Sequence, residues 1–263
     1  MAGTEVVGDL LARDRRSRDP ALVTPDDRER TAHDLITNAY KAANVLRYLG
    51  AREGSTVAVD PTPGFHAALA FLGAAGLGAA VRFDPAAGVA AGDRVAVVPV
   101  GRERSLDPKP GTNLAVFGGS PERAETTHWE QELWSENPAT PPTTVSPSDP
   151  VIRGEHGDVS HRRLLDAAES VATDRGIDAG TRVVVRTTFA DPRAVAAGVI
   201  APLARGGVVV LAGPAGGAGS AAESSTGSDP RGDLAVVDEP AAEPPEPTRI
   251  DLGSLPEVVR QDR

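Results

Sequence analysis

The sequence predicts an α/β fold made of two similar βαβ-type units, each with mostly parallel strands flanked by helices. Three observations carry this prediction. Short apolar strands alternate with helical patterns, the same order of elements occurs twice, and the helical patterns begin at capping residues and end at glycines. Strands that are apolar throughout and alternate with helices are typical of parallel sheets covered on both faces.

The first unit, residues 1–135, opens with a helix that Thr31 begins and Gly50 ends. Thr31 and Asp34 have the spacing of a capping box, in which side chains satisfy the first free amides. The strand STVAVD follows, and Thr62 with Pro63 predicts the cap and first turn of a second helix that ends in glycines. The apolar runs AAVRF, DRVAVVPV and NLAVF predict three further strands.

The second unit, residues 151–212, repeats this order. Ser160 caps a helix that ends near Gly176, TRVVVR is a strand, and Asp191 begins the next helix, which stops at Gly206 before the strand VVVL. The Pro-rich segment 136–150 is predicted to be a stiff linker. Residues 213–263 are predicted to be a largely flexible Gly/Ser/Pro-rich tail, with one possible strand at 233–239.

Composition limits the classes of function. The net charge is -10 with a pI near 5.0, which argues against general binding to nucleic acid or to membrane surfaces. The absence of Cys excludes disulfides and thiolate zinc sites. No secretion signal or apolar membrane span is evident, so a cytoplasmic protein is expected. Lysine occurs only at Lys41 and Lys109, and this acid excess with scarce Lys indicates either adaptation to concentrated salt or a GC-rich genome.

Two long runs carry a family resemblance. The run from ALVTPDDRERTAHDL to AAVRFDP, within residues 9–85, resembles the opening of the adenylate-forming superfamily, which includes acyl-CoA synthetases and peptide-synthetase adenylation domains. The run from SHRRLLDAAES to GGVVVL, within residues 145–212, resembles the segment that follows that family's phosphate loop. The resemblance implies two similar αβ subdomains, ATP or AMP and CoA as possible ligands, and acid–thiol ligase activity.

The sequence departs from the family where ATP phosphates bind. Family members carry a Ser/Thr/Gly-rich loop ending in Gly-x-Pro-Lys, but only RGEHGD stands here, with two acids and no Lys. The remnant of this loop is predicted to consist of Arg153, Gly154, Gly157 and Ser160. His156 and His161 lie near two acids, but a loop and a helix cap explain them better than a metal, and no metal site is predicted.

A second departure lies at TTFADP. Relatives place an aromatic–His pair near the acyl pocket, whereas here Phe189 is followed by Ala190 and Asp191. The candidate substrate residues are therefore Thr187, Thr188, Phe189 and Asp191. Ligands of doubly wound sheets bind beyond the carboxyl ends of the strands, which is where both candidate segments are expected.

Three interpretations stay open. The chain is a non-catalytic or regulatory relative of acyl-CoA synthetases that binds an adenylate-like ligand, a CoA thioester or a complete synthetase. Alternatively, it is half of a split acyl-CoA or acetyl-CoA synthetase that forms an acyl-adenylate only with a chain supplying the missing C-terminal half. The third is a degenerate product without activity. The first predicts no catalytic residues and no enzyme activity of the chain alone.

One further motif concerns partners. Trp129 and Trp134, in HWEQELW, are expected on a helix that packs its rings onto the first unit. Exposed rings there would instead indicate a partner site.

Overall fold

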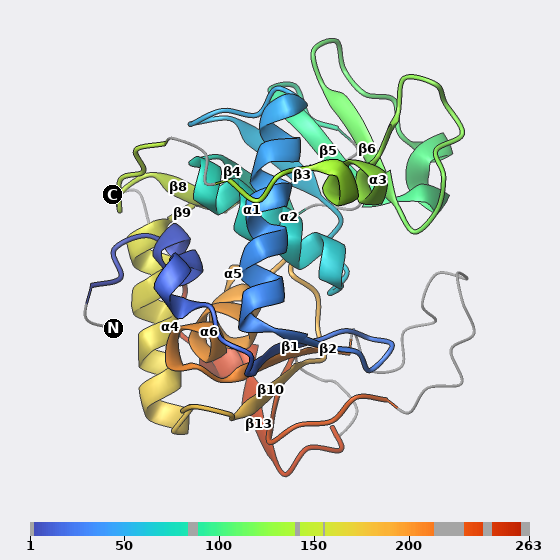
Figure 1. Ribbon diagram of the computed structural model, residues 1–263. Coiled ribbons are helices and arrows are strands. Elements are labelled where there is room, and N and C mark those ends of the chain that lie inside the picture. Colours follow the sequence, from blue (N-terminus) through green and yellow to red (C-terminus); the bar gives the residue numbers. More distant parts are fainter. Residues whose placement is uncertain are drawn as a thin grey trace.

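The computed structural model describes residues 3–83, 89–139, 143–154, 156–212, 229–238 and 244–258. Figure 1 shows two sheets, one above the other, with helix α1 running from the lower sheet towards the upper one. The predicted α/β class with two mostly parallel sheets is confirmed.

The upper sheet has seven strands in the order β7-β6-β5-β3-β4-β8-β9. All neighbouring pairs are parallel except β8 and β9, which form an antiparallel hairpin. In chain order, the strands are β3 (Thr56–Val59), β4 (Ala80–Phe83), β5 (Asp93–Pro99), β6 (Asn113–Phe117), β7 (Thr127–His128), β8 (Pro150–Gly154) and β9 (Gly157–Ser160).

The lower sheet has six strands in the order β13-β12-β10-β11-β1-β2, and only β1 and β2 pair antiparallel. Its strands are β1 (Pro20–Val23), β2 (Glu29–Thr31), β10 (Arg182–Val185), β11 (Val208–Leu211), β12 (Leu234–Val237) and β13 (Thr248–Asp251).

The helices connect and cover these sheets. They are α1 (Ala32–Tyr48), α2 (Phe65–Leu77), α3 (Trp129–Ser135), α4 (His161–Arg175), and a continuous stretch of α5 (Pro192–Val195), the π-turn η4 (Ala196–Ile200) and α6 (Ala201–Arg205). Short 3-10 turns are η1 (Val7–Leu11), η2 (Arg13–Arg15), η3 (Val100–Ser105) and η5 (Leu252–Ser254). No helix in the described ranges is both long and apolar enough to cross a membrane.

Most helix boundaries follow the predicted caps. The Thr31–Asp34 capping box is present, and the side chains of Ser160 and Asp191 accept hydrogen bonds from the first turns of α4 and α5. The helices α2, α4 and α6 each end at a left-handed glycine.

The cap predicted at Thr62 and Pro63 is wrong. The helix α2 begins at Phe65, after Gly64, and has no side-chain cap. The amide of Thr62 donates instead to Asp60 Oδ1 at 3.0 Å. The side chain of Asp60 thus holds Thr62 in a turn before the helix begins. Asp side chains compete with helix formation by bonding to nearby backbone amides.

The predicted duplication is visible in matching hydrogen bonds. The amide of Asp60 donates to Val97 O at 3.0 Å, and the amide of Arg186 donates to Val236 O at 2.9 Å. In each sheet the first strand of the repeat lies between the second and third, giving the orders β5-β3-β4 and β12-β10-β11. Both repeats are therefore wound in the same way.

The two sheets exchange strands across the predicted linker at 136–150. The hairpin β1–β2, from the first predicted unit, joins the lower sheet, whereas β8 and β9, from the second, join the upper sheet. The strand expected within 233–239 is β12, and β13 gives the predicted flexible tail a second ordered strand. The Gly/Ser-rich stretch 213–228 lies outside the described residues.

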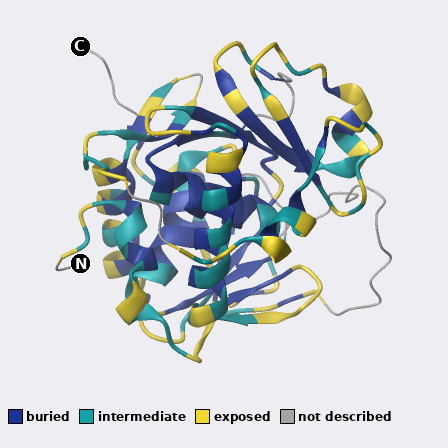
Figure 2. Ribbon diagram, turned by 45° about the horizontal axis from the view of Figure 1, so that its top comes forward, coloured by how far each residue is buried: buried dark blue, intermediate teal, exposed yellow. Residues whose placement is uncertain are grey.

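One hydrophobic core joins both sheets and the helices. Buried residues gather in the strands and along the facing sides of the helices, and exposed residues gather in the loops (Figure 2). The rings of Phe71, Phe83 and Phe189 form a chain with centroid distances of 5.9 Å and 5.5 Å. Phe189 thereby links the loop after β10 to the end of β4.

Candidate functional site

The segment predicted to replace the phosphate loop is the tip of the β8–β9 hairpin. Gly154 pairs with Gly157, so only residues 155–156 lie between them, and Gly157 has a φ of 122° that favours glycine. Arg153 lies opposite Asp158 on the neighbouring strand, with Nε 4.0 Å from Oδ2. The described residues of this segment therefore form a strand pair.

Arg153 points away from the carboxyl ends of the sheet. Its guanidinium donates to Gly54 O at 3.4 Å, and Gly54 precedes β3. Ser160, the last residue of the predicted remnant, accepts a hydrogen bond from the amide of Arg163 at 3.3 Å and caps α4. Both side chains thus have structural partners.

His161 begins α4 and is fully buried. Its Nδ1 accepts a hydrogen bond from the amide of Val7 at 3.1 Å. Burial lowers the pKa of His161 to about 4, while the carboxylates of Asp149 and Asp9 oppose this shift. The imidazole is therefore neutral at pH 7 and anchors η1 to α4.

The predicted substrate segment joins the two sheets. The amide of Phe189 donates to Pro61 O at 2.8 Å, and the hydroxyl of Thr188 donates to the same oxygen at 3.3 Å. Pro61 follows β3, and Thr187 and Phe189 are both buried. The loops after the two central strands, β10 and β3, are consequently in direct contact.

Asp191 ends this segment with a structural role. Its Oδ1 accepts from the amide of Arg193 at 2.8 Å, and its Oδ2 lies 2.6 Å from the guanidinium of the same residue. The hydrogen bond to Asp191 raises the pKa of Arg193 above its usual range. The carboxylate is therefore already paired where a substrate contact is predicted.

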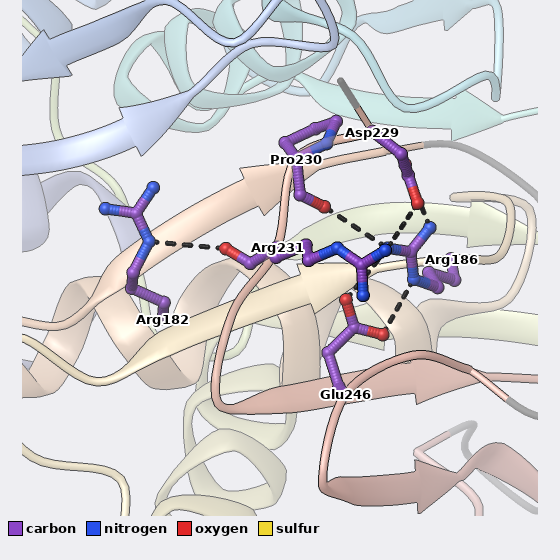
Figure 3. A network of polar contacts seen from close by, with 6 residues as sticks. All are labelled: Arg182, Arg186, Asp229, Pro230, Arg231 and Glu246. Carbon is purple, nitrogen blue, oxygen red and sulfur yellow. Dashed lines mark hydrogen bonds and ion pairs between the residues drawn. The ribbon is translucent and has the colours of Figure 1, made fainter.

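Sequence reasoning missed Arg186, the first residue after β10. Its guanidinium is held bidentately by Glu246, with two contacts of 2.8 Å, and also contacts Asp229 and Pro230 O (Figure 3). Arg186 is 5 % exposed and the Glu246 side chain 0 %. The hydrogen bonds that Arg186 donates to Glu246 raise the pKa of Arg186. The sequence signal for this ion pair is an arginine directly after an apolar strand, as in VVVR.

The equivalent position in the upper sheet also carries an ion pair. Asp60, the first residue after β3, is buried and lies 3.3 Å from Arg102. In both sheets the strand order reverses at this point, which is where doubly wound folds bind ligands. Each of these places is thus occupied by an internal ion pair.

A second group of titratable side chains lies at the end of β6. Glu130 Oε1 accepts from the amide of Gly118 at 2.6 Å, and the carboxylate lies 3.7 Å from His66 and 3.5 Å from His128. Burial lowers the pKa of His66, Glu130 opposes this shift and Arg30 adds to it. Within the described ranges, no three His, Cys, Asp or Glu side chains are placed to hold a metal ion.

The two predicted binding segments do not converge. Arg153 contacts the chain before β3, whereas Thr188 and Phe189 contact it after β3. A pocket of about 370 Å³ lies elsewhere, between η1, α1, α2 and residues 143–145, and none of the predicted site residues lines it. The binding roles of the predicted residues stay predictions.

No protein-family model and no curated protein matches the sequence. Solved structures match its fold. The anthranilate CoA ligase AuaEII, solved with anthranoyl-AMP, has a TM-score of 0.72 and 18% identity, covering 89% of this chain and 49% of that one. A benzoate CoA ligase from Burkholderia xenovorans LB400 has a TM-score of 0.70 and 15% identity, covering 89% and 50%.

A Mycobacterium tuberculosis fatty acyl CoA synthetase is also similar, with a TM-score of 0.65 and 21% identity, covering 79% of this chain and 44% of that one. The chain spans about half the length of these ligases. The predicted resemblance to the adenylate-forming superfamily is confirmed at the level of fold.

Proposed function

We propose that this chain is a non-catalytic, regulatory relative of the acyl-CoA synthetases that does not form acyl-adenylates alone. The β8–β9 hairpin is the observation that carries the proposal. Phosphates are bound by several converging amides and a cation, but the hairpin tip has two residues and no Lys. Its nearest cation, Arg153, donates to Gly54 O.

The loops after the central strands support the same proposal. The bond from Phe189 to Pro61 and the ion pair of Arg186 with Glu246 lie where ligands of doubly wound folds bind. The shared fold with CoA ligases suggests a complete synthetase as the partner of this chain.

The split-synthetase alternative has one observation in its favour. The chain matches about half the length of the CoA ligases, so a second chain could supply the rest of the catalytic machinery. In that case the phosphate contacts come from the partner, and activity appears only in the complex.

Ligand binding and adenylation together test the proposal. Purified chain in molar KCl is titrated with Mg-ATP, AMP, CoA and a non-hydrolysable acyl-adenylate analogue, and its melting temperature is measured. A ligand that binds only the folded state raises this temperature as it saturates. We expect no saturable shift and no ATP–pyrophosphate exchange. A saturable shift with the analogue, together with exchange activity, contradicts the proposal.

Two variants and one complex extend the test. If an anion does bind at the hairpin, Arg153→Ala abolishes the shift, whereas the control Arg162→Ala, at an exposed position on α4, leaves it unchanged. For the alternative, the tagged chain is purified from its native cells with any stoichiometric partner. Exchange activity in that complex, absent from both separated chains, favours the split synthetase.

A further inference from the structure

The two tryptophans of HWEQELW lie in different surroundings. Trp129 is buried, as the sequence predicts, whereas Trp134 on the same helix is 88 % exposed. Nothing in the described ranges covers the Trp134 ring, so its exposure alone does not identify a partner.

The pocket of about 370 Å³ between η1, α1 and α2 lies apart from all the predicted site residues. Volumes of roughly 300–1,000 Å³ are typical of small-molecule sites. The space exists because small residues line it, with Ala39 and Ala43 on α1 and Ala75 and Gly76 on α2. Where η1 crosses α2, a Cβ added at Gly8 would lie 3.5 Å from Gly76 Cα. Large side chains at these positions would fill the pocket.

Hydrogen bonds hold the walls of this pocket in place. The hydroxyl of Tyr40, on α1, donates to Leu11 O in η1, and the neutral imidazole of His161 anchors η1 to α4. The segment 143–145 is held by Thr143 Oγ1, which donates to Gly76 O at 3.0 Å. The pocket is therefore preformed, and a ligand that enters it does not have to order its walls.

Asp9 supplies the charge of the pocket. Its Oδ2 accepts from the amides of Glu5 at 2.8 Å and Val6 at 2.9 Å, while its Oδ1 accepts no hydrogen bond from the described residues. No Lys, Arg or His is among the described residues that line the pocket. Arg16 stacks on the Tyr40 ring, with Cζ 5.2 Å from the ring centroid, but does not line the pocket. One carboxylate oxygen thus lacks a partner here.

The remaining lining is mostly apolar. Leu11, Leu72, Val6 and Val145 add branched side chains to the alanines and glycines. Such walls favour a hydrocarbon group, because removing it from water stabilises the bound state. A carboxylate or phosphate on the ligand would be repelled by Asp9 and by the net charge of -10. A protonated amine would instead donate a charge-assisted hydrogen bond to the Asp9 carboxylate.

We propose that this pocket binds a small organic amine, with its ammonium group at Asp9 and its hydrocarbon part along α1 and α2. Mg-ATP, AMP and CoA all carry phosphates, so none of them is expected to enter it. The site is also separate from the β8–β9 hairpin. The amine proposal is therefore independent of whether the chain forms acyl-adenylates.

Three probes of equal chain length separate the effect of charge from that of apolar burial: hexylamine, hexanol and hexanoate. NMR titration of the isotope-labelled protein near neutral pH follows the amide resonances of Gly8 and Gly76, which line the pocket. Gly176, at the end of α4, serves as the reference. We expect saturable shifts at Gly8 and Gly76, with the tightest binding for hexylamine, weaker binding for hexanol and none for hexanoate.

One variant removes the charge and keeps the local structure. Asp9→Asn retains an oxygen that can accept from the Glu5 and Val6 amides. It should weaken hexylamine binding at least about tenfold and leave hexanol binding unchanged, which also shows that the pocket is folded. The matched control Asp14→Asn removes an exposed acid from η2, outside the pocket, and should leave both affinities unchanged.

Three results would overturn the proposal. The first is the absence of a saturable shift at Gly8 and Gly76 when hexylamine is added to the wild-type protein. The second is equal affinity for hexylamine and hexanol, or unchanged hexylamine affinity in Asp9→Asn, because either shows that the carboxylate does not recognise the ligand. The third is a shift at Gly176 as large as that at Gly76, which indicates general binding of amines to an acidic protein.

Discussion

The first residue after each central strand, β3 and β10, carries a buried charge that is paired within the chain. Asp60 pairs with Arg102, and Arg186 pairs with Glu246 and Asp229. The Asp60 carboxylate and the Arg186 guanidinium are the buried charges, and each has a partner from within the chain, because an unpaired buried charge costs several kcal/mol. At the residue scale, charged side chains that follow the central strands of both sheets are paired within the chain.

His161 makes folding depend on pH. Its pKa is about 4 in the folded chain and about 6.5 when unfolded, so the unfolded state binds more protons between these values. Stability is then fully present above pH 6.5 and falls as the pH drops towards 4. We expect the free energy of unfolding in urea to lose about 2 kcal/mol from this group by pH 5.

The matched variant is His161→Asn, whose side-chain oxygen can accept the hydrogen bond from the Val7 amide without titrating. Its unfolding free energy should depend less steeply on pH than that of the wild type over this range. Parallel pH profiles for the two proteins would assign the acid sensitivity to other groups.

At the scale of elements, α2 packs so tightly on α1 that one glycine is required. A Cβ at Gly73 would lie 2.8 Å from Ala43 N and 2.9 Å from Ala42 Cβ. At Gly76, one turn on, it would meet nothing closer than Leu11 Cδ1 at 3.8 Å. The helix propensity gained by alanine is the same at both positions, but only Gly76 has room for the added Cβ.

We therefore expect Gly73→Ala and Gly76→Ala to change stability in opposite directions. Gly73→Ala forces the helices apart and should destabilise the protein by about 1–3 kcal/mol. Gly76→Ala gains helix propensity and should stabilise it by up to about 1 kcal/mol. Urea unfolding of both variants measures the difference, and equal effects would show that the α1–α2 contact adapts freely.

Helix ends could be predicted from the sequence because caps act locally. Thr31, Ser160 and Asp191 bond to amides within three residues, and the stop at Gly176 needs only its own backbone freedom. Strand partners could not be predicted in the same way. Leu22 in β1 pairs with Val209, far away in the chain, and nothing in PALV identifies that partner.

In the candidate site too, local features could be predicted from the sequence and long-range contacts could not. The shortness of RGEHGD is visible in the sequence, and the structure turns it into a tight hairpin. The direction of Arg153 is not visible, because it depends on Gly54 from another part of the sheet. The network around Arg186 likewise needs Asp229 and Glu246, which come from a segment predicted to be flexible.

At the scale of the whole molecule, the exchange of strands ties the two sheets together. Without residues after the linker, β4 loses β8, and β1 loses its parallel partner β11. Leu22 and Val23, both buried, would then face water. Phe189 adds a bond and an aromatic contact between the sheets. The two repeats are similar in structure, but each sheet is built from both.

We therefore expect the protein to unfold as one cooperative unit, although its sequence contains a duplication. In calorimetry, one transition should appear whose calorimetric enthalpy equals its van't Hoff enthalpy. Phe189→Ala removes a fully buried ring and should cost about 3–5 kcal/mol. Because that ring lies between the sheets, the variant should lower the temperature of the single transition without splitting it. Two resolved transitions in either protein would instead show that residues 1–135 and 151–212 fold as separate units.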